Sequence, residues 1–369
     1  MKGLLPRIPS AARKLFRLVQ ESARLLSKAA ALQATGALRS DKLIIFLVPG
    51  DEFLSGGILS IFSLYRLSAE MTAIHEAKVL VCFYPGEGWD TAGYRMFDNN
   101  VTIYPFAMVQ AACRGVRQLL LHVPEYAAPQ VMERIGWERL AELRRTRGLR
   151  INILNQNNLF MAGDEFLERL RRTLPETTCT TAHPSYTTPA LRRAWGLPTH
   201  FLPAWTAPDD CPATAFEAKR DLMLISPDPS AYREAVLQKL ASELPGLETR
   251  VISAMRYQDY LELERTAKWS LTFGEGLDGY FIGVFLRGGV GFAVYNEDFF
   301  SPEHRGLRTI YPDYDTLLAR IIEDIRSLDN KADFEACNAS VRPILSATWS
   351  PARTRAALEE YYRGHYTLP

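Results

Sequence analysis

The sequence lacks both the paired cysteines of a disulfide framework and the clustered ligands of a zinc site. Its five cysteines, Cys82, Cys113, Cys179, Cys211 and Cys337, lie far apart, and neither a CxxC nor an HExxH pattern occurs. An odd, scattered set favours a reducing compartment and argues against a disulfide-stapled secreted fold. We therefore expect a cytoplasmic protein without a structural metal.

A strong excess of one charge is also missing from most of the chain. The formal net charge is +1, from 43 Lys and Arg residues and 42 Asp and Glu residues. Residues 1–42 hold nine of the basic residues and only two acidic ones, so the remaining chain is net acidic. A net acidic body without a basic stripe disfavours nucleic-acid binding.

The basic excess belongs to the segment SAARKLFRLVQESARLLSKAAAL, whose apolar spacing predicts a helix. Arg13, Arg17, Arg24 and Lys28 fall on one face. The apolar residues of the opposite face are Leu15, Leu18, Val19, Leu25, Leu26 and Ala29. The segment is too short and interrupted to span a bilayer, and its recurring charges are unlike a signal peptide. Such a helix can lie in an anionic membrane interface; the alternative is an ordinary helix packed on its own domain.

Strand and helix patterns alternate through the rest of the chain. Its length of 369 residues favours two domains. Near-continuous apolar runs such as KLIIFLV are typical of parallel strands buried on both faces. The pattern predicts an α/β fold with two doubly wound domains facing a cleft. We expect a basic amphipathic helix at residues 1–41, a first domain at 42–206, a second at 207–349 and a terminal crossing helix at 350–369.

Candidate sites lie in the loops after the strands, because ligands of open α/β sheets bind there. Gly56 and Gly57 begin a helix and let an acceptor or phosphate approach free N–H groups, although the loop matches no dinucleotide or P-loop motif. His183 follows a second strand, and His122 with Glu125 ends a third. His183 and His122 are the catalytic candidates; His183 could instead be structural, and His122 and Glu125 could instead be surface residues.

The stretch LTFGEGLDGYFIGVFLRGGVGFAVYN places Glu275 between two glycines at the end of a predicted strand. A carboxylate there can accept hydrogen bonds from sugar hydroxyls, and the glycines let a ligand come close. The pattern therefore fits a sugar nucleotide better than an isolated phosphate; the alternative is a turn with a solvated glutamate. The donor-binding candidates are Glu275, Gly276, Asp278, Tyr280, Ser226 and Tyr257.

The two-domain plan and this stretch resemble the GT-B glycosyltransferases, especially the retaining group with a glutamate-containing donor site. Phe273, Glu275 and Gly276 match the start of that group's motif, whereas Gly283 stands where the motif has a second glutamate. The resemblance implies two Rossmann-like domains. The first would bind the acceptor and the second a nucleoside-diphosphate sugar, with neither cofactor nor metal.

The implied function is transfer of a sugar to a glycan or lipid-linked acceptor in bacterial surface-polysaccharide synthesis, on the inner face of the cytoplasmic membrane. The leaving diphosphate needs a cation, for which Arg233 and Arg256 are candidates. Because Gly283 departs from the motif, two other classes stay open. One is a non-catalytic nucleotide-sugar-binding protein, and the other is an epimerase of the same fold.

Overall fold

The structure is a computed structural model that describes residues 10–366 except 51–54, 85–100, 184, 186–187, 206–211 and 254. Side chains are described from residue 19 onward. Cys211 and the side chains of Arg13, Arg17, Leu15 and Leu18 therefore lie outside the described residues. The described cysteines, Cys82, Cys113, Cys179 and Cys337, are free and buried.

The first domain is built on a seven-stranded parallel sheet with the order β3-β2-β1-β4-β5-β6-β7. The strands are β1 (Lys42–Val48), β2 (Lys78–Phe83), β3 (Ile103–Pro105), β4 (Gln118–Pro124), β5 (Leu149–Asn155), β6 (Thr178–Thr181) and β7 (Thr199–Phe201). Along the chain, β2 and β3 are added on one side of β1, and β4 to β7 are then added on its other side. The strand order reverses between β1 and β4, where folds of this kind bind ligands at the C-terminal strand ends.

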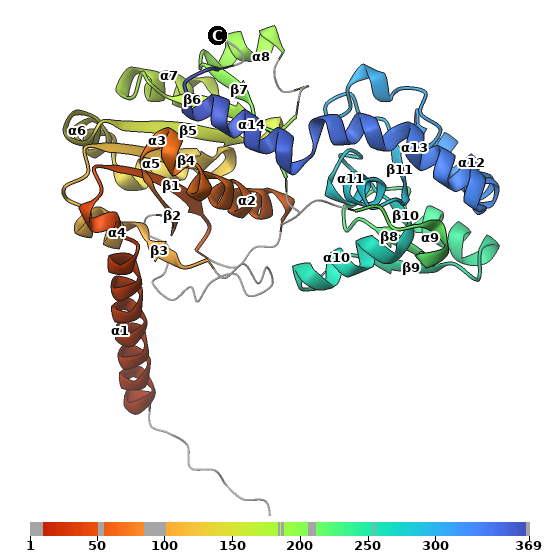
Figure 1. Ribbon diagram of the computed structural model, residues 1–369, viewed down its shortest axis with the longest axis horizontal. Helices are drawn as coiled ribbons and strands as arrows, with labels where there is room; N and C mark the ends of the chain where they lie inside the picture. Colours follow the sequence, from red (N-terminus) through yellow and green to blue (C-terminus); the bar gives the residue numbers. More distant parts are fainter. Residues whose placement is uncertain are drawn as a thin grey trace, which may run out of the picture.

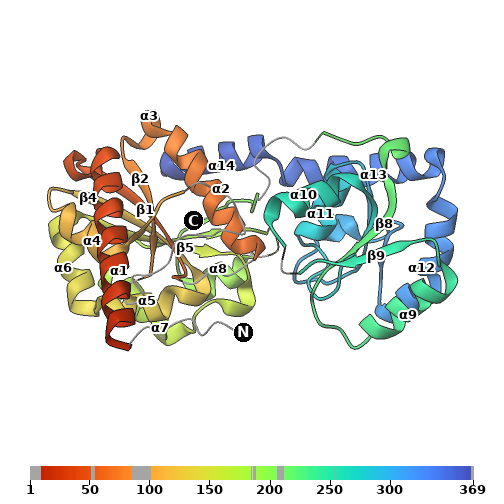
Figure 2. The same ribbon diagram turned by 90° about the horizontal axis from the view of Figure 1, so that it is seen from below.

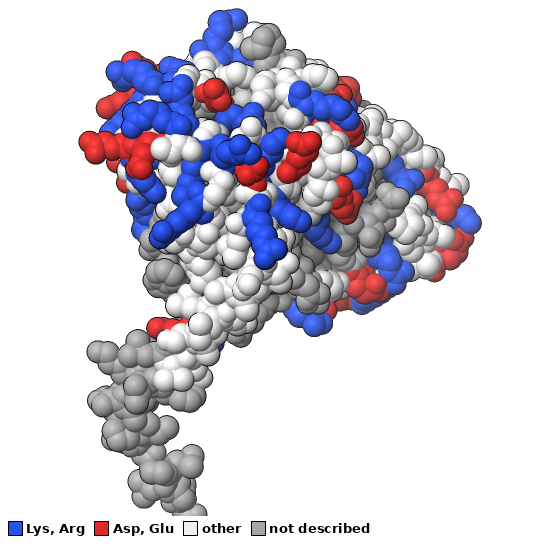
Figure 3. Space-filling view, turned by 60° about the vertical axis from the view of Figure 1, so that its left-hand side comes forward, with Lys and Arg blue, Asp and Glu red and all other residues white. Residues whose placement is uncertain are grey.

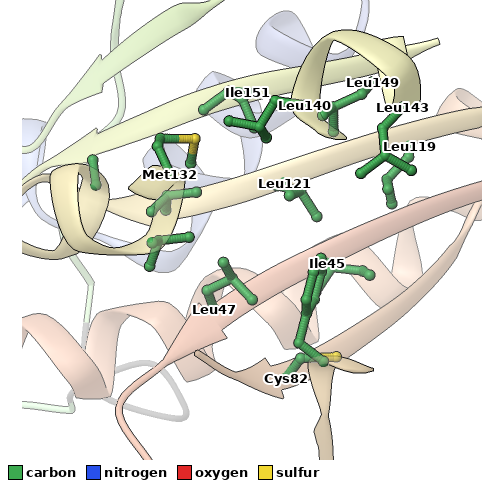
Figure 4. Packing of buried hydrophobic residues seen from close by; sticks show 14 of the residues in the cluster. Ile45, Leu47, Cys82, Leu119, Leu121, Met132, Leu140, Leu143, Leu149 and Ile151 are labelled. Atoms are coloured by element: carbon green, nitrogen blue, oxygen red, sulfur yellow. The ribbon is translucent and has the colours of Figure 1, made fainter. Parts of the chain in front are cut away.

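Helices cover both faces of this sheet (Figure 1). They are α2 (Gly56–Glu70), α3 (Thr72–His75), α4 (Phe106–Ala112), α5 (Ala128–Ile135), α6 (Trp137–Arg147), α7 (Asp164–Thr173) and α8 (Pro189–Trp195). Alternate residues of β1 enter two apolar clusters, Ile45 with the α5 and α6 side and Ile44 with the α2 side. Figure 4 shows the first cluster, in which Met132 and Leu140 lie near Leu121. Burial on both faces explains the near-continuous apolar runs.

The second domain has a five-stranded parallel sheet with the order β12-β11-β10-β8-β9. The strands are β8 (Arg220–Ile225), β9 (Glu248–Val251), β10 (Ala267–Leu271), β11 (Val290–Val294) and β12 (Ile310–Tyr311). Its helices are α9 (Arg233–Glu243), α10 (Tyr257–Thr266), α11 (Gly279–Leu286), α12 (Tyr314–Leu328) and α13 (Lys331–Thr348). The predicted α/β fold with two doubly wound domains is confirmed.

The two domains lie side by side, and the C-terminal ends of their strands meet (Figures 1 and 2). Asn157, after β5, donates a hydrogen bond to Glu275, after β10, at 2.8 Å. Ser185, after β6, donates to the carbonyl oxygen of Asp298 at 2.7 Å. These contacts place the loops that follow β5, β6, β10 and β11 at one interface.

The last helix, α14 (Pro351–Tyr362), returns to the first domain. The hydroxyl of Tyr361 lies 3.0 Å from the Thr178 hydroxyl, and that of Tyr362 lies 2.6 Å from the Ser68 hydroxyl. Leu358 is fully buried in the apolar cluster that contains α2. The chain thus crosses between the domains twice.

The first helix, α1 (Ser10–Ala34), projects from the first domain (Figure 1). Leu32 is buried in the first domain, and the Lys28 ammonium lies 5.2 Å from the centre of the Phe83 ring. Val19 and Leu26, farther out, are 60% and 72% exposed. The described helices include none with the length and apolarity needed to cross a bilayer.

Candidate functional site

Glu275 stands on a tight turn between β10 and α11. Gly274 and Gly276 have φ angles of 69° and 75°, in the left-handed region that glycine adopts at little cost. A Cβ added at Gly276 would approach the carbonyl oxygen of Val294 to 2.7 Å. The hydroxyl of Thr272 donates to the Gly276 carbonyl at 2.8 Å. Both glycines are therefore required by the turn that presents Glu275 to the first domain.

The Glu275 carboxyl group is half-buried at the domain interface. Burial raises its pKa to about 7, and the nearby Asp228 adds to this shift. The hydrogen bond from Asn157 acts in the opposite direction but is the smallest of the three causes. The carboxyl group therefore exchanges its proton near neutral pH. Its predicted contact with a donor sugar stays a prediction.

The first domain brings a second carboxyl group, Glu125, to the same interface. Glu125 begins the 3-10 turn η2 (Glu125–Ala127) directly after β4 and is only 2% exposed. Its Oε1 accepts a hydrogen bond from the Asn157 backbone at 3.1 Å. Burial raises its pKa to about 7, and Glu275 contributes to the rise. Asn157 thus binds one carboxyl group through its backbone and the other through its side chain.

Three acceptor atoms at these strand ends have no hydrogen-bond partner within the described parts of the chain. They are Glu125 Oε2, Asn155 Oδ1 and Thr181 Oγ1. Asn155 and Thr181 are direct partners in the parallel pairing of β5 with β6. Buried polar atoms are normally paired, so this group marks a place for a donor from outside the protein, such as a hydroxyl or water.

The loop that carries Asn157 also contacts the beginning of α2. Ser55 caps α2 by accepting a hydrogen bond from the Ile58 backbone at 3.2 Å. Gln156 donates to the Gly57 carbonyl at 3.2 Å, and a Cβ at Gly57 would lie 2.3 Å from the Gln156 amide oxygen. A side chain at Gly57 would therefore require the Gln156 amide to move, whereas no atom lies within 4 Å of a Cβ added at Gly56. Ligand binding by this loop stays a prediction.

His183 lies after β6 at the domain interface. Its ring centre is 5.9 Å from that of Phe299 and 6.0 Å from that of Trp349. Burial lowers its pKa to about 4, so its imidazole is neutral at physiological pH. A neutral imidazole can accept a proton, and the catalytic role of His183 stays a prediction.

His122 occupies the middle of the first domain, which corrects the expectation that it ends a strand beside the site. It lies within β4 and is fully buried, with its ring stacked on Phe46 at 4.3 Å. Its Nδ1 is 3.0 Å from the Asn152 amide and its Nε2 is 3.4 Å from the Tyr362 hydroxyl. Burial lowers its pKa to about 3. A histidine enclosed by the sheet and α14 is a packing residue.

Asp278 and Tyr280 belong to the start of α11. The Asp278 carboxylate accepts hydrogen bonds from the backbones of Tyr280 and Phe281 at 2.9 and 3.0 Å, and it is therefore the N-cap. These two N–H groups are therefore already bound within the protein. The Tyr280 ring packs edge-on against the Tyr260 ring, with 5.6 Å between the ring centres.

Ser226 and Tyr257 likewise make structural contacts. The Ser226 hydroxyl is fully buried and accepts a hydrogen bond from the Phe273 backbone at 3.0 Å, which ties β8 to the end of β10. Tyr257, at the start of α10, packs into the apolar cluster of the first domain that contains α2. Tyr257 therefore belongs to the contact between the domains.

Gly283, the departure from the motif, leaves room for a carboxylate from another helix. A Cβ at Gly283 would lie 1.9 Å from Oε1 of Glu264, on α10. Glu264 forms a buried ion pair with Arg287 at 2.5 Å and accepts a hydrogen bond from the Tyr260 hydroxyl at 2.7 Å. Position 283 must therefore stay small for this ion pair to form.

Of the two predicted cations, only Arg233 lies beside the Glu275 turn. Its Nη1 donates to the carbonyl oxygens of Ser226 at 2.5 Å and Asp228 at 2.9 Å, and its guanidinium lies 5.3 Å from the Phe273 ring centre. Arg256 instead forms a two-pronged ion pair with the exposed Asp259. Within the described ranges, no three His, Cys, Asp or Glu side chains gather as metal ligands.

Sequence reasoning missed a pocket of about 370 Å³ beside the turn. It lies at the ends of β10 and β11 and is lined by Gly274, Val294, Tyr295, Asn296, Glu297, Arg305 and Tyr314. The Arg305 guanidinium lies 4.6 Å from the centre of the Tyr295 ring. Aromatic rings with an adjacent cation suit a ligand that combines a ring with negative charge.

No protein-family model and no curated protein matches the sequence. Solved structures share its architecture, among them HepE from Anabaena in complex with UDP-glucose. HepE is 12% identical, with 87% of this chain and 99% of HepE covered and a TM-score of 0.53. The glycotransferase of kitacinnamycin is 11% identical, with 88% and 99% covered and a TM-score of 0.51.

BGT of phage T4, solved with UDP and Mn²⁺, is 10% identical, with 89% of this chain and 100% of BGT covered and a TM-score of 0.50. At such low identity, these matches concern the fold. They agree with the two parallel sheets, the strand ends that meet and the returning C-terminal helix. The chain therefore has the GT-B fold of the nucleotide-sugar glycosyltransferases.

Proposed function

We propose that this protein transfers a sugar from a nucleoside-diphosphate sugar to an acceptor hydroxyl. The observation that carries the proposal is the pair of protonatable carboxyl groups, Glu125 and Glu275, joined by Asn157 where the two domains meet. Glycosyl transfer needs a group that binds sugar hydroxyls and a group that takes up a proton. The solved complex of HepE with UDP-glucose supports a sugar nucleotide as the donor class.

On the second domain, Glu275 would accept hydrogen bonds from hydroxyl groups of the donor. Arg233, fixed beside the turn by two carbonyl oxygens, would balance the charge of the diphosphate. The pocket lined by Tyr295, Arg305 and Tyr314 offers further space next to Glu275. In this arrangement, Asp278 shapes the site by capping α11 and does not contact the donor.

On the first domain, Glu125 would receive the proton of the acceptor hydroxyl through its unpaired Oε2. The acceptor oxygen forms a bond to the anomeric carbon, and the bond from that carbon to the diphosphate oxygen breaks. The electron pair of the broken bond leaves with the diphosphate. A carboxyl group with a pKa of about 7 suits this task, because its acid and base forms are both populated near neutral pH.

For the acceptor, we propose a glycan or lipid-linked sugar of bacterial surface-polysaccharide synthesis, used on the cytoplasmic side of the membrane. The support is α1, which carries the exposed Val19 and Leu26 beside basic residues such as Arg24. An apolar strip with adjacent cations binds anionic bilayer surfaces. Changing Val19 and Leu26 to Gln should reduce sedimentation with anionic vesicles and leave transfer to a soluble acceptor unchanged. If the wild-type protein does not sediment with anionic vesicles, the membrane role is contradicted.

The donor is tested by a thermal-shift and calorimetry panel of UDP-, GDP- and dTDP-sugars. We expect one donor to bind, and Glu275→Ala to weaken it by about 10- to 100-fold, as for a lost charge-assisted hydrogen bond. The matched control is Glu323→Ala, an exposed residue on α12. If the folded Glu275→Ala variant binds the donor as tightly as wild type, Glu275 does not contact the donor.

Product analysis then separates the classes of function. Transfer to an acceptor supports the proposal, whereas donor binding without turnover would identify a non-catalytic binder. An altered stereocentre in the donor would identify an epimerase. We propose that transfer needs no metal ion, and the same assay with EDTA or added Mn²⁺ tests this.

A further inference from the structure

A row of basic side chains lines the N-terminal edge of the first sheet, opposite the candidate site. The register aligns the starts of neighbouring strands, with Lys78 beside Leu43, Lys42 beside Gln118, and Leu119 beside Leu149. The segments that precede these strands, including the last turn of α6, hold most of the basic residues. The basic residues of this edge, which we call the basic edge, are Arg39, Lys42, Lys78, Arg114, Arg117, Arg144, Arg145, Arg147 and Arg150.

Most of this charge is not neutralised within the protein. Arg117 forms an ion pair with Asp41, and Lys42 pairs with Glu76 at 2.7 Å. The other members make no ion pair within the described ranges; they are Arg39, Lys78, Arg114, Arg144, Arg145, Arg147 and Arg150. Figure 3 shows many Lys and Arg side chains at this end of the molecule, with fewer Asp and Glu side chains among them.

The basic edge is also hollowed. A cavity of about 200 Å³ lies between the strand starts and the end of α14. Its lining residues include Lys42, His75, Gln118, Arg150 and Tyr366, together with one carboxylate, Glu176. Cations, amide and hydroxyl groups around a hollow suit an oxygen-rich anionic group such as a phosphate.

The helix α1 leaves the molecule at this same end (Figures 1 and 3). Its exposed Val19 and Leu26 have no apolar partner among the described residues. A bilayer with anionic headgroups matches both features, since it accepts apolar side chains and attracts nearby cations. Nucleic acid would satisfy the arginines but would leave the apolar side chains of α1 in water.

We propose that the basic edge of the first domain is a docking surface for an anionic lipid bilayer, which it binds together with α1. The folded domain, and not only its first helix, then fixes the orientation of the protein on the membrane. The bilayer lies at the start of the strands and the candidate site at their end. The two are separated by at least the length of a strand, about 23 Å for seven residues.

This distance narrows the acceptor class, an inference that rests on the proposed function. A sugar attached directly to a lipid headgroup would lie at the bilayer surface and would not reach Glu125 at the other end of the strands. A glycan of several sugars could reach the site while its lipid stays in the membrane. We therefore expect the acceptor to be an oligosaccharide or a growing glycan chain.

The docking surface is tested by sedimentation with vesicles, without any sugar donor, so the result does not depend on transferase activity. One set of vesicles contains phosphatidylcholine alone, and the other also contains phosphatidylglycerol. The variant Arg144→Gln/Arg145→Gln/Arg150→Gln removes three charges of the basic edge. At low ionic strength it should bind the anionic vesicles roughly 100-fold more weakly than wild type, from about a factor of five per basic residue near the surface.

The control, Arg250→Gln/Arg320→Gln/Arg326→Gln, removes three exposed charges from the second domain and should bind like wild type. Arg320 and Arg326 are ion-paired with Asp324 and Glu243, so urea unfolding of this variant checks that it is folded. A second edge variant, Arg39→Gln/Lys78→Gln, gives an independent measurement on different strands. Unchanged vesicle binding by both edge variants would overturn the proposal. So would tighter binding of wild type to a DNA duplex than to vesicles, lost in the edge variants, because the edge would then be a nucleic-acid surface.

Discussion

The two edges of the first sheet differ in how they carry charge. At the C-terminal edge, Glu125 is enclosed by the protein and Glu275 is half-buried against it, and burial raises the pKa of each to about 7. At the N-terminal edge, Arg144, Arg145 and Arg150 are exposed and make no ion pair among the described residues. The same parallel strands therefore present protonatable groups at one end and permanent charges at the other.

This difference has an energetic meaning. A buried carboxyl group changes the free energy of the folded state by itself, because desolvation penalises its charged form. An exposed guanidinium loses little by staying hydrated, so one residue contributes little to folding. Several exposed basic residues have a large effect only on binding, when they attract the same anionic partner. The following experiments test these expectations, beginning with the largest effect.

Glu125→Gln should reduce the rate of transfer by about 10²- to 10⁴-fold, the usual contribution of a general base. Gln cannot take up the proton of the acceptor, whereas donor affinity on the second domain should be retained. Steady-state kinetics together with donor calorimetry measure both. Glu138→Gln, an exposed residue on α6, is the control and should act like wild type. If His183→Asn abolishes transfer and Glu125→Gln does not, His183 is the base instead.

Gly283→Ala should destabilise the second domain by about 3 kcal/mol, within the range for breaking a buried ion pair. The added methyl group would overlap the Glu264 carboxylate that binds Arg287. Gly283→Glu, which completes the family motif, should also destabilise the protein and should not improve activity. Urea unfolding provides the measurement, and Gly279→Ala, where no atom lies within 4 Å of the new Cβ, is the control. Equal stability of both alanine variants would contradict the assigned packing.

Glu125 should also make folding stability depend on pH. Its pKa of about 7 in the folded state exceeds the ordinary value of 4.5, so the folded state holds a proton that the unfolded state loses between these values. The free energy of unfolding should therefore fall by about 3 kcal/mol as pH rises through this window. Glu125→Gln removes this pH-dependent contribution of the carboxyl group, so the variant should be more stable than wild type at about pH 8. Urea unfolding at several pH values tests this; parallel pH profiles for wild type and variant would contradict it.

Arg144→Gln should produce the smallest effect, a change within about 0.5 kcal/mol in the free energy of unfolding. Arg144 is exposed at the end of α6 and has no carboxylate partner among the described residues. Thermal and urea unfolding would show whether this holds. A loss of several kcal/mol would mean that the exposed edge contributes to folding as the buried edge does.

Much of the fold could be predicted from the sequence because buried parallel strands leave a local pattern. The runs that form β1, β2, β4 and β11 are mostly apolar over five to seven residues, and β5, β8 and β10 keep apolar residues between polar ones. By contrast, β3 has three residues and β12 has two, too few to show any pattern. They exist because a neighbouring strand edge offers hydrogen bonds, which depends on the tertiary structure.

The candidate site could be predicted only in part, since its members come from distant segments. Glu275 carries a local signal, a carboxylate between glycines after a strand. Its partner Asn157 is 118 residues away and has no recognisable motif. The sequence placed His122 near a strand end, but its neighbours Asn152 and Tyr362 come from other parts of the chain. The sequence shows that Gly283 replaces the second glutamate of the motif. It does not show that the Glu264 carboxylate occupies the space beside Gly283.

The return of α14 to the first domain has a consequence for protein synthesis. The carbonyl oxygen of Ala357 on α14 lies 2.7 Å from His200 Nε2, although the two residues are 157 positions apart. Tyr361 and Leu358 complete the apolar cluster over β1 and α2. While the second domain is still being translated, the part of this face on which α14 packs is therefore uncovered. Apolar side chains of the first domain would be exposed to water during that interval, because α14 follows the whole second domain in the chain.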